Sequence, residues 1–446
     1  MDHQISSIIR KALKIFWLTI VAIAAVLSAV ALTLQVPQVQ TRLARKAVDA
    51  VEGKLDAEIS FEKIHFQPFR TLLVKNVTII DRNPVYDVDD PAKARVDTFF
   101  RAEYITARFS FKGLFKQEGI HLDDAVIENA QMNLVLEDKE DTGDGDTSTD
   151  NLSRIFRLKK PETPKRSEKE IFHIKDVRIE DMGFSMKNYG SKKTPYHGGI
   201  DWNDLDVRDI CITAEELQFK AGIMSGKAED LSFREKSGYR AESFSGSARV
   251  GRGKTIVENL IIKDPWSDLH LPMFMMSYDN VKAFSDFISR VKIDAVIDDS
   301  HLDFRTLHYF APELEGNTLK AGISGKVSGF VDNFNIHDIR FAQEDGGFSG
   351  RVSGTMKGIP DIEETSLEAS VKGLNFTAEG LGNFLSKWMH EGKADLGRFA
   401  RGIIFMTDAE VYGKLDDMNV RAGITSITGR LDADLSIGNM IASDKP

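Results

Sequence analysis

The sequence predicts a mainly β protein, in which an amino-terminal transmembrane helix precedes an elongated, antiparallel, repeating β-groove with a few short helices. Segment 15–34 carries no charge, and a helix needs about 20 apolar residues to cross the hydrocarbon core of a membrane. From position 55 onward, apolar and polar residues alternate in many segments, which is typical of strands with one buried face. Candidate helices in that region are few and short.

The composition excludes several classes of protein. The 58 basic and 68 acidic residues give a formal net charge of −10, whereas a general nucleic-acid-binding protein normally has a basic excess. Cys211 is the only cysteine of the sequence. The chain therefore cannot form an internal disulfide, and it has too few thiolates for a zinc knuckle or an iron–sulfur cluster.

Residues 1–35 are predicted to form a cytoplasmic tail and a membrane anchor. Basic residues precede the uncharged segment and Trp17 lies near its start, as expected for a cytoplasmic flank and an interfacial aromatic. Ala29 and Ala31 also fit a signal-peptide cleavage site, but the apolar segment continues to Leu34, which favours an uncleaved anchor. Both alternatives export the rest of the chain.

Residues 36–54 are predicted to form an amphipathic helix, because apolar residues recur there at helical spacing. Pro37 suits its first turn and Gly53 its end. The helix either docks at the membrane interface or covers the sheet that follows.

Residues 55–136 are predicted as a first β-groove unit. In one of its strands, Phe109 and Phe111 share a face with Ile105 and Ala107, while polar residues take the other face.

Residues 137–170 are predicted to be a polar linker or loop with a short helix-like segment from Asn151. Its acidic part supplies closely spaced oxygen donors, but the ligand order and the terminal Glu of an EF-hand are absent. A solvated loop is therefore favoured over a calcium site that would use Asp141, Asp144, Asp146 and Asp150.

Residues 171–446 are predicted as a repeating β-groove body. Ile293 and Ile297 lie on one face of a predicted strand, as do Val352 and Met356 in a later one. Brief helices are expected at 280–289, 303–310 and 382–390. A weak repeat, Lys or Arg followed by Ala-Gly-Ile, begins at Lys220, Lys320 and Arg421; it indicates either a repeated multi-strand unit or chance.

The sequence gives no positive case for catalysis, a cofactor or a metal. Segment 248–255 matches a relaxed phosphate-loop pattern, but a strand pattern follows it where a phosphate loop requires a helix. Asp298, Asp299, His301 and Asp303 could bind a metal, yet a polar turn and a helix cap are favoured. Cys211 lies in a predicted strand without an activating neighbour. We expect a protein that is not an enzyme.

The start of the chain combines the Val36-Pro37 exit from the membrane, a helix that ends near Gly53 and a strand pair at 59–64 and 73–77. In these residues it resembles the AsmA/TamB superfamily of inner-membrane-anchored periplasmic proteins of Gram-negative bacteria, and it looks most like the TamB-type members of the Bacteroidetes. Segments 301–334 and 358–365 are also similar to that family. Because TamB-type chains are usually far longer, we expect the amino-terminal portion of such a chain or a short member.

The resemblance implies a β-groove with an apolar lining and a polar outside that conducts phospholipid between membranes or aids outer-membrane protein assembly. It implies an inner-membrane, single-pass protein with its bulk in the periplasm. Its expected partners are phospholipid and an outer-membrane barrel protein of the TamA type. Our candidate groove-lining residues are Phe109, Phe111, Ile293, Ile297, Val352 and Met356. The alternative functions are a β scaffold or adaptor that binds proteins through exposed strand edges and, least favoured, a periplasmic hydrolase.

Overall fold

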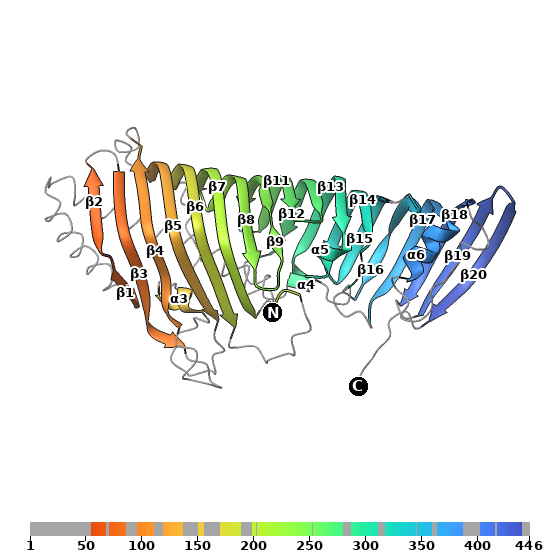
Figure 1. Ribbon diagram of the computed structural model, residues 1–446, viewed down its shortest axis with the longest axis horizontal. Helices are drawn as coiled ribbons and strands as arrows, with labels where there is room; N and C mark the ends of the chain where they lie inside the picture. The colour runs from red at the N-terminus through yellow and green to blue at the C-terminus, as the bar shows by residue number, and fades with distance from the viewer. Residues whose placement is uncertain are drawn as a thin grey trace. The chain divides into compact units, whose positions relative to one another are not determined.

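The computed structural model describes residues 55–67, 71–85, 96–110, 119–136, 150–155, 170–188, 199–201, 203–251, 253–279, 287–310, 316, 318–344, 346–358, 364–386, 402–414 and 417–438. They are mainly β (Figure 1). In this part of the chain, no helix combines the length and the apolar character that a membrane crossing requires. The predicted anchor at 1–35 and the amphipathic helix at 36–54 lie outside the described residues.

The chain forms two compact units, Met1–Arg252 and Gly253–Pro446, whose boundary falls inside the segment predicted as one body. In the first unit, β1 and β2 pair with β3, consecutive strands pair from β3 to β8, and β8 also pairs with β9 and β10. These strands are β1 (Ala57–Ser60), β2 (Lys63–Gln67), β3 (Thr71–Val85), β4 (Val96–Phe109), β5 (Ile120–Leu136), β6 (Glu170–Asn188), β7 (Asp204–Lys220), β8 (Ile223–Glu235), β9 (Arg240–Ala241) and β10 (Ser243–Val250).

One pair of strands corrects the prediction of an antiparallel sheet. β5 and β6 run parallel, with Ile120 opposite Phe172 and Leu136 opposite Asn188. A parallel neighbour requires a crossover connection of about a dozen residues or more, and segment 137–169 is that connection. The prediction was wrong here because alternation of apolar and polar residues reports which face is buried, not the direction of the neighbouring strand.

The crossover carries a short helix, α3 (Asn151–Ile155), that packs into the core of the first unit. Leu152 and Ile155 are fully buried. The Asn151 side chain accepts a hydrogen bond from the Val135 N–H at 3.0 Å and donates one to the Asn133 carbonyl at 2.9 Å. The helix-like segment inside the predicted linker is thus held against the end of β5.

Asp150 belongs to this buried region as well. It is 3% exposed and forms a β-bridge with Leu136. The other three aspartates considered as calcium ligands, at positions 141, 144 and 146, lie outside the described residues.

The core of the first unit is one cluster of apolar side chains. Fully burying one Leu, Ile or Phe side chain contributes about 1.5–3 kcal/mol to the stability of the fold. Dense packing is concentrated in this unit. The largest fully buried side chains of the described residues all belong to it: Phe99, Phe100, Ile127, Leu134, Leu136, Leu152, Ile155, Phe172, Ile174 and Met186.

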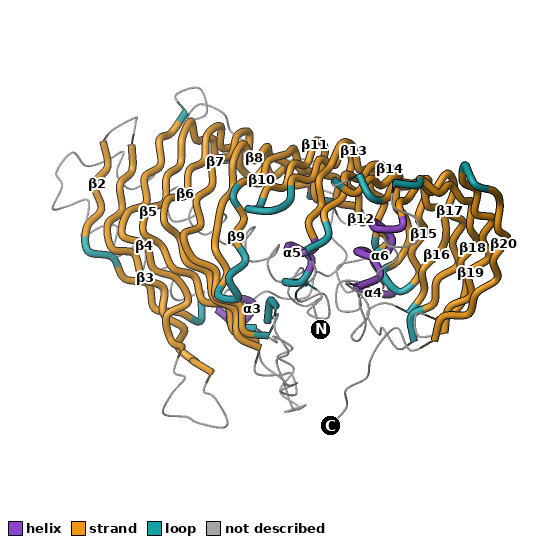
Figure 2. Tube along the Cα trace, turned by 45° about the vertical axis from the view of Figure 1, so that its right-hand side comes forward, coloured by secondary structure: helices purple, strands orange, loops and turns teal. Residues whose placement is uncertain are grey.

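In the second unit, consecutive strands pair antiparallel from β11 to β20. Its short helices lie on one side of its sheet (Figure 2) and overlap the three predicted ones. They are α4 (Phe287–Arg290), α5 (Phe304–Leu307) and α6 (Ala378–Ser386). The strands are β11 (Lys254–Lys263), β12 (Asp268–Ser277), β13 (Lys292–Asp303), β14 (Lys320–Phe330), β15 (Asn333–Gln343), β16 (Phe348–Lys357), β17 (Ser366–Thr377), β18 (Ile404–Lys414), β19 (Asp417–Ser426) and β20 (Gly429–Gly438).

Residues in the left-handed conformation interrupt strands of both units. Asn129 and Asp181, with φ of 50° and 55°, lie side by side on β5 and β6. Asn259 on β11 and Asp338 on β15 have φ of 52° and 46°. Asn and Asp tolerate this conformation better than most residues, and an irregular pairing increases the twist and bend of a strand. The positions divide each strand into two segments with different facing patterns.

The three Ala-Gly-Ile segments do not mark a structural repeat. The first spans the turn between β7 and β8, where Ala221 and Gly222 have positive φ. The second lies at the start of β14 and the third lies in the middle of β19. The similarity at these positions is therefore one of sequence only.

Candidate functional site

The candidate site is the apolar face of the second unit, formed by β13 to β20. Residues directly opposite each other on neighbouring strands point to the same side of a sheet, so the register assigns the members of this face. Ile339 is opposite Val352, and Val352 is opposite Val371. Its large members include Ile293, Ile297, Val327, Phe334, Ile336, Ile339, Phe341, Val352, Met356, Leu367, Val371, Leu374, Val411, Val420, Ile424, Leu431 and Leu435.

These side chains remain in contact with water, unlike the buried core cluster of the first unit. Each is partly buried or exposed, and exposure reaches 62% at Leu431 and 51% at Leu435 on β20. Apolar surface gains about 25 cal/mol for each Å² removed from water. A contiguous exposed apolar surface typically marks a site that binds a protein, a membrane or an apolar ligand.

Four of the six predicted lining residues lie on this face. Ile293 and Ile297 project from β13, Val352 and Met356 from β16, and all four are partly buried. Ile293 and Met356 belong to one cross-strand row, which passes through Gly329 and Phe334.

The other two candidates do not belong to the apolar face of the second unit. Phe109 ends β4 in the first unit, where it is 7% exposed within the buried core. Phe111 lies outside the described residues.

The sequence reasoning missed an aromatic row at one end of the apolar face. Phe341 stacks on Phe348 with ring centroids 5.3 Å apart, and Phe376 stacks on Phe405 at 5.4 Å. Phe348 is directly opposite Phe376, so the row continues across β15 to β18. Phe341 and Phe376 follow Asp338 and Gly373, whose positive φ shifts the apolar alternation of β15 and β17, and that shift is the sequence signal that could have revealed them. Phe348 and Phe405 continue the regular alternation of β16 and β18, and the alternating pattern alone places Phe348 on the face of Val352 and Met356.

The helix α6 closes this end of the sheet tightly. The Thr377 N–H, directly before α6, donates to the Gly347 carbonyl at 3.2 Å. A Cβ at Gly380 would lie 2.2 Å from the same carbonyl oxygen, so only glycine fits there. The close approach fixes the start of α6 beside the aromatic row.

A buried polar cluster fixes α5 at the end of β13. The Thr306 hydroxyl donates to the Asp264 carboxylate at 2.7 Å and shares a 2.7 Å hydrogen bond with the Ser267 hydroxyl. Asp303 caps α5 by accepting from the Arg305 N–H at 2.9 Å, which confirms the predicted cap. Burial opposes ionisation of Asp303, but hydrogen bonds from Arg305 outweigh it and hold the pKa of this carboxyl below its usual value.

The other residues considered with Asp303 as metal ligands do not converge. Asp298, Asp299 and His301 are exposed on β13, and His301 pairs with Glu344 at 3.3 Å. The prediction of a polar turn at these residues was wrong, because the strand continues through them to Asp303. In the described part of the chain, no group of three or more His, Cys, Asp or Glu residues is placed to hold a metal ion.

Two other segments considered as reactive sites, the phosphate-loop pattern at 248–255 and the strand around Cys211, are parts of the β-sheet. Strand β11 begins at Lys254, where a phosphate loop would need a helix, and the Thr255 hydroxyl shares a 3.2 Å hydrogen bond with the Tyr278 hydroxyl. Cys211 is an exposed free thiol on β7.

Comparison with known proteins finds no relative of the chain. No family model matches the chain, and no curated protein or solved structure matches it.

Proposed function

We propose that this chain is a membrane-anchored envelope protein of the AsmA/TamB type that binds phospholipid acyl chains on the apolar face of its second unit and conducts lipid along it. The observation that carries the proposal is the run of partly exposed apolar side chains across β13 to β20. The uncharged segment 15–34 supports the anchor, and the resemblance of the sequence supports a role in outer-membrane assembly with a barrel partner.

The chemistry of this face suits acyl chains because their burial needs no directional contact. Each methylene transferred from water to an apolar surface gains about 0.8 kcal/mol. Branched aliphatic side chains and Met356 offer similar contacts at successive strands, so a chain that slides from one strand to the next meets small differences in free energy. The proposed function is non-catalytic.

Photo-crosslinking in cell membranes tests the proposal on the full chain. Benzoylphenylalanine replaces Val352 or Ile293 on the apolar face, and Glu368 on the polar face of β17 is the matched control position. We expect phospholipid adducts, detected by mass spectrometry, at positions 352 and 293 and none at 368. Equal lipid labelling at all three positions, or none in chains that fold normally, would contradict the proposal.

Charge substitution gives a second test. Val352→Arg and Ile293→Arg place a cation on the apolar face, where contact with acyl chains would desolvate it. We expect less phospholipid to copurify with these variants and wild-type amounts with Glu368→Arg. Circular dichroism of each variant checks that the sheet is intact.

The alternative function, an adaptor that binds protein partners by strand addition, has one observation in its favour. Within the described residues β20 pairs with β19 alone, and its Leu431 and Leu435 are exposed. Exposed edge strands can accept a strand from another protein. If the protein is an adaptor, Val352→Arg leaves partner capture unchanged, whereas a proline within β20 abolishes it.

A further inference from the structure

Three cationic side chains lie side by side on the polar face of the second unit. Arg340 on β15 is directly opposite Arg351 on β16, and Arg351 is directly opposite Lys372 on β17. All three are exposed. Like charges directly opposite each other destabilise a sheet, so this arrangement is unfavourable unless an anion offsets it.

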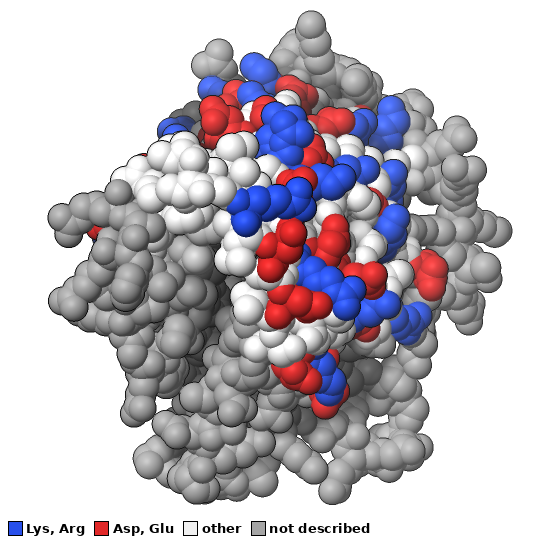
Figure 3. Space-filling model, turned by 90° about the vertical axis from the view of Figure 1, so that its right-hand side faces the viewer, with Lys and Arg blue, Asp and Glu red and all other residues white. Residues whose placement is uncertain are grey.

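Two cations elsewhere on the same face, on β18 and β19, have acidic partners. Arg421 pairs with Asp434 at 3.2 Å, and Lys414 pairs with Glu364 at 2.8 Å. Figure 3 shows basic and acidic side chains interspersed on the side that carries the C-terminal strands. In the described part of the chain, by contrast, no carboxylate forms an ion pair with Arg340, Arg351 or Lys372.

The nearest carboxylates on β18 already have other hydrogen-bond donors. Asp408 accepts from the Gly373 N–H at 2.7 Å, and Glu410 accepts from the Ser370 hydroxyl at 2.8 Å. These contacts engage both acids with neutral groups of β17.

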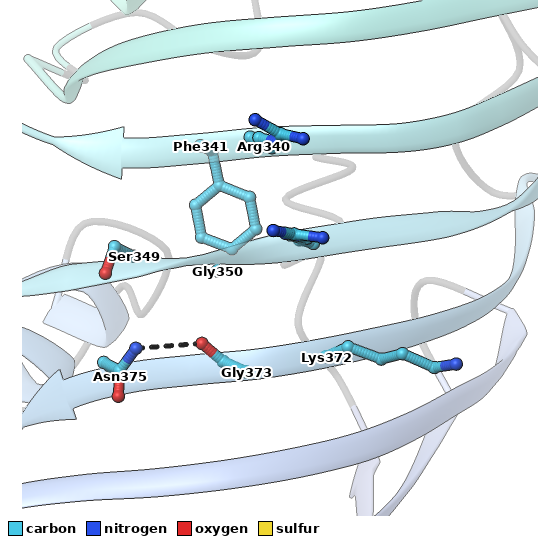
Figure 4. Close-up of a pocket in the computed structure, with 8 residues that line it drawn as sticks. Arg340, Phe341, Ser349, Gly350, Lys372, Gly373 and Asn375 are labelled. Carbon is cyan, nitrogen blue, oxygen red and sulfur yellow. Dashed lines mark hydrogen bonds between the residues drawn. The ribbon is translucent and has the colours of Figure 1, made fainter.

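The cations border a hollow of about 510 Å³ on these strands. Ser349 and Asn375 lie at its other end (Figure 4). The Asn375 amide donates to the Gly373 carbonyl at 3.0 Å, which orients its side-chain oxygen and nitrogen.

Two large apolar side chains are exposed beside the hollow on this otherwise polar face. Met406 is directly opposite Asn375, and Ile404 is directly opposite Thr377, so both point to the same side as the cations. Met406 is 55% exposed and Ile404 is 61% exposed. A cationic site next to exposed apolar side chains fits an amphiphile better than a free anion.

We propose that Arg340, Arg351 and Lys372 bind the phosphate group of an anionic phospholipid headgroup, with Met406 and Ile404 against the adjoining apolar part of the lipid. A guanidinium presents a planar fork of N–H donors that matches two phosphate oxygens, and Lys372 adds a point charge. This site lies on the face opposite the proposed acyl-binding face and does not depend on that function.

The test measures binding of dioctanoyl phosphatidylglycerol, a soluble anionic lipid, to the full chain in a neutral detergent. Methyl NMR of selectively labelled methionine follows the Met406 signal, which Met406→Leu assigns. We expect the lipid to shift this signal and Arg351→Gln to weaken its affinity at least about tenfold, which corresponds to about 1.4 kcal/mol. Lys414→Gln, which removes a paired cation from the same face, is the matched control and should bind as the wild type does.

Titrations with inorganic phosphate and with dioctanoyl phosphatidylcholine distinguish the phosphate of an anionic lipid from a free phosphate. The proposal requires phosphatidylglycerol to bind more tightly than both. It also requires Met406→Ser, whose binding is measured by isothermal titration calorimetry because the variant lacks the Met406 signal, to weaken phosphatidylglycerol binding. Inorganic phosphate that binds as tightly, with no effect of Met406→Ser, would overturn the assignment to a lipid in favour of a free phosphate. Equal affinity of the wild type and Arg351→Gln would overturn the site. Acyl binding on the opposite face does not need Arg351, so failure here is distinguishable from failure of the proposed function.

Discussion

Arg154 donates to the carboxylate of Asp81 at 2.5 Å and thereby joins α3 to β3 across 73 positions of the chain. The Asp81 side chain is 1% exposed and that of Arg154 12%. The pair links the crossover of the parallel strands β5 and β6 to a strand on the other side of β4. It is a buried ion pair inside the core of the first unit.

Asp81→Asn should strongly destabilise the first unit. Loss of one partner of a buried ion pair costs about 3–5 kcal/mol, because it removes an opposite charge that offsets the desolvation of the other. Hydrogen exchange of α3 and β3, followed by mass spectrometry, measures the loss. Arg208→Gln is the control, because Arg208 is 74% exposed in its pair with Asp206, and an exposed pair contributes about 0–1 kcal/mol. Similar losses in both variants would contradict the buried character of the Arg154 pair.

In the Asp303→Asn variant, the stability of α5 should fall less on acidification than it does in the wild type. The pKa of Asp303 is lowered in the folded chain, so its ionised form stabilises the fold above the unfolded pKa of about 3.9 and this contribution is lost as the pH falls through the folded pKa. Asparagine preserves a side-chain cap but cannot pair ionically with Arg305. Thermal unfolding between about pH 2 and 7 should show a smaller acid loss in the variant, and identical pH profiles would exclude this role.

Asn259→Val should destabilise the second unit, whereas Asn259→Gly should be nearly neutral. Asn259 is exposed and has φ of 52°, a conformation that costs an L-residue about 1–2 kcal/mol and a β-branched residue more. Glycine adopts it without steric strain. Urea denaturation of the two variants measures the difference. If valine is tolerated as well as glycine, the left-handed conformation does not determine the choice of residue.

Gly380→Ala should displace α6 from the sheet. Its Cβ would meet the Gly347 carbonyl at 2.2 Å, and overpacking of this kind costs about 1–3 kcal/mol. We expect faster hydrogen exchange over 378–386 and little change in β11 to β13. Glu379→Ala, at the exposed neighbouring position, should exchange as the wild type does, and faster exchange in both variants would point to a general effect on the helix.

The sequence by itself determined the β class, the two-faced strands and the approximate places of the short helices. Alternation is a local property: Val352 and Met356 share a face because successive side chains in a strand point to opposite sides. The Asp303 cap was also predictable, because an Asp directly before a helix accepts from the backbone N–H groups of its first turn.

Only the tertiary structure decided which apolar faces become buried. Phe109 and Val352 follow the same alternating pattern, yet Phe109 lies in a closed core and Val352 remains partly exposed. Burial depends on what packs against a face, and in the first unit part of the cover is α3, which comes from a segment that composition marks as polar. The parallel pairing of β5 and β6 and the alignment of Arg340, Arg351 and Lys372 likewise depend on register between strands, which a pattern within one strand does not specify.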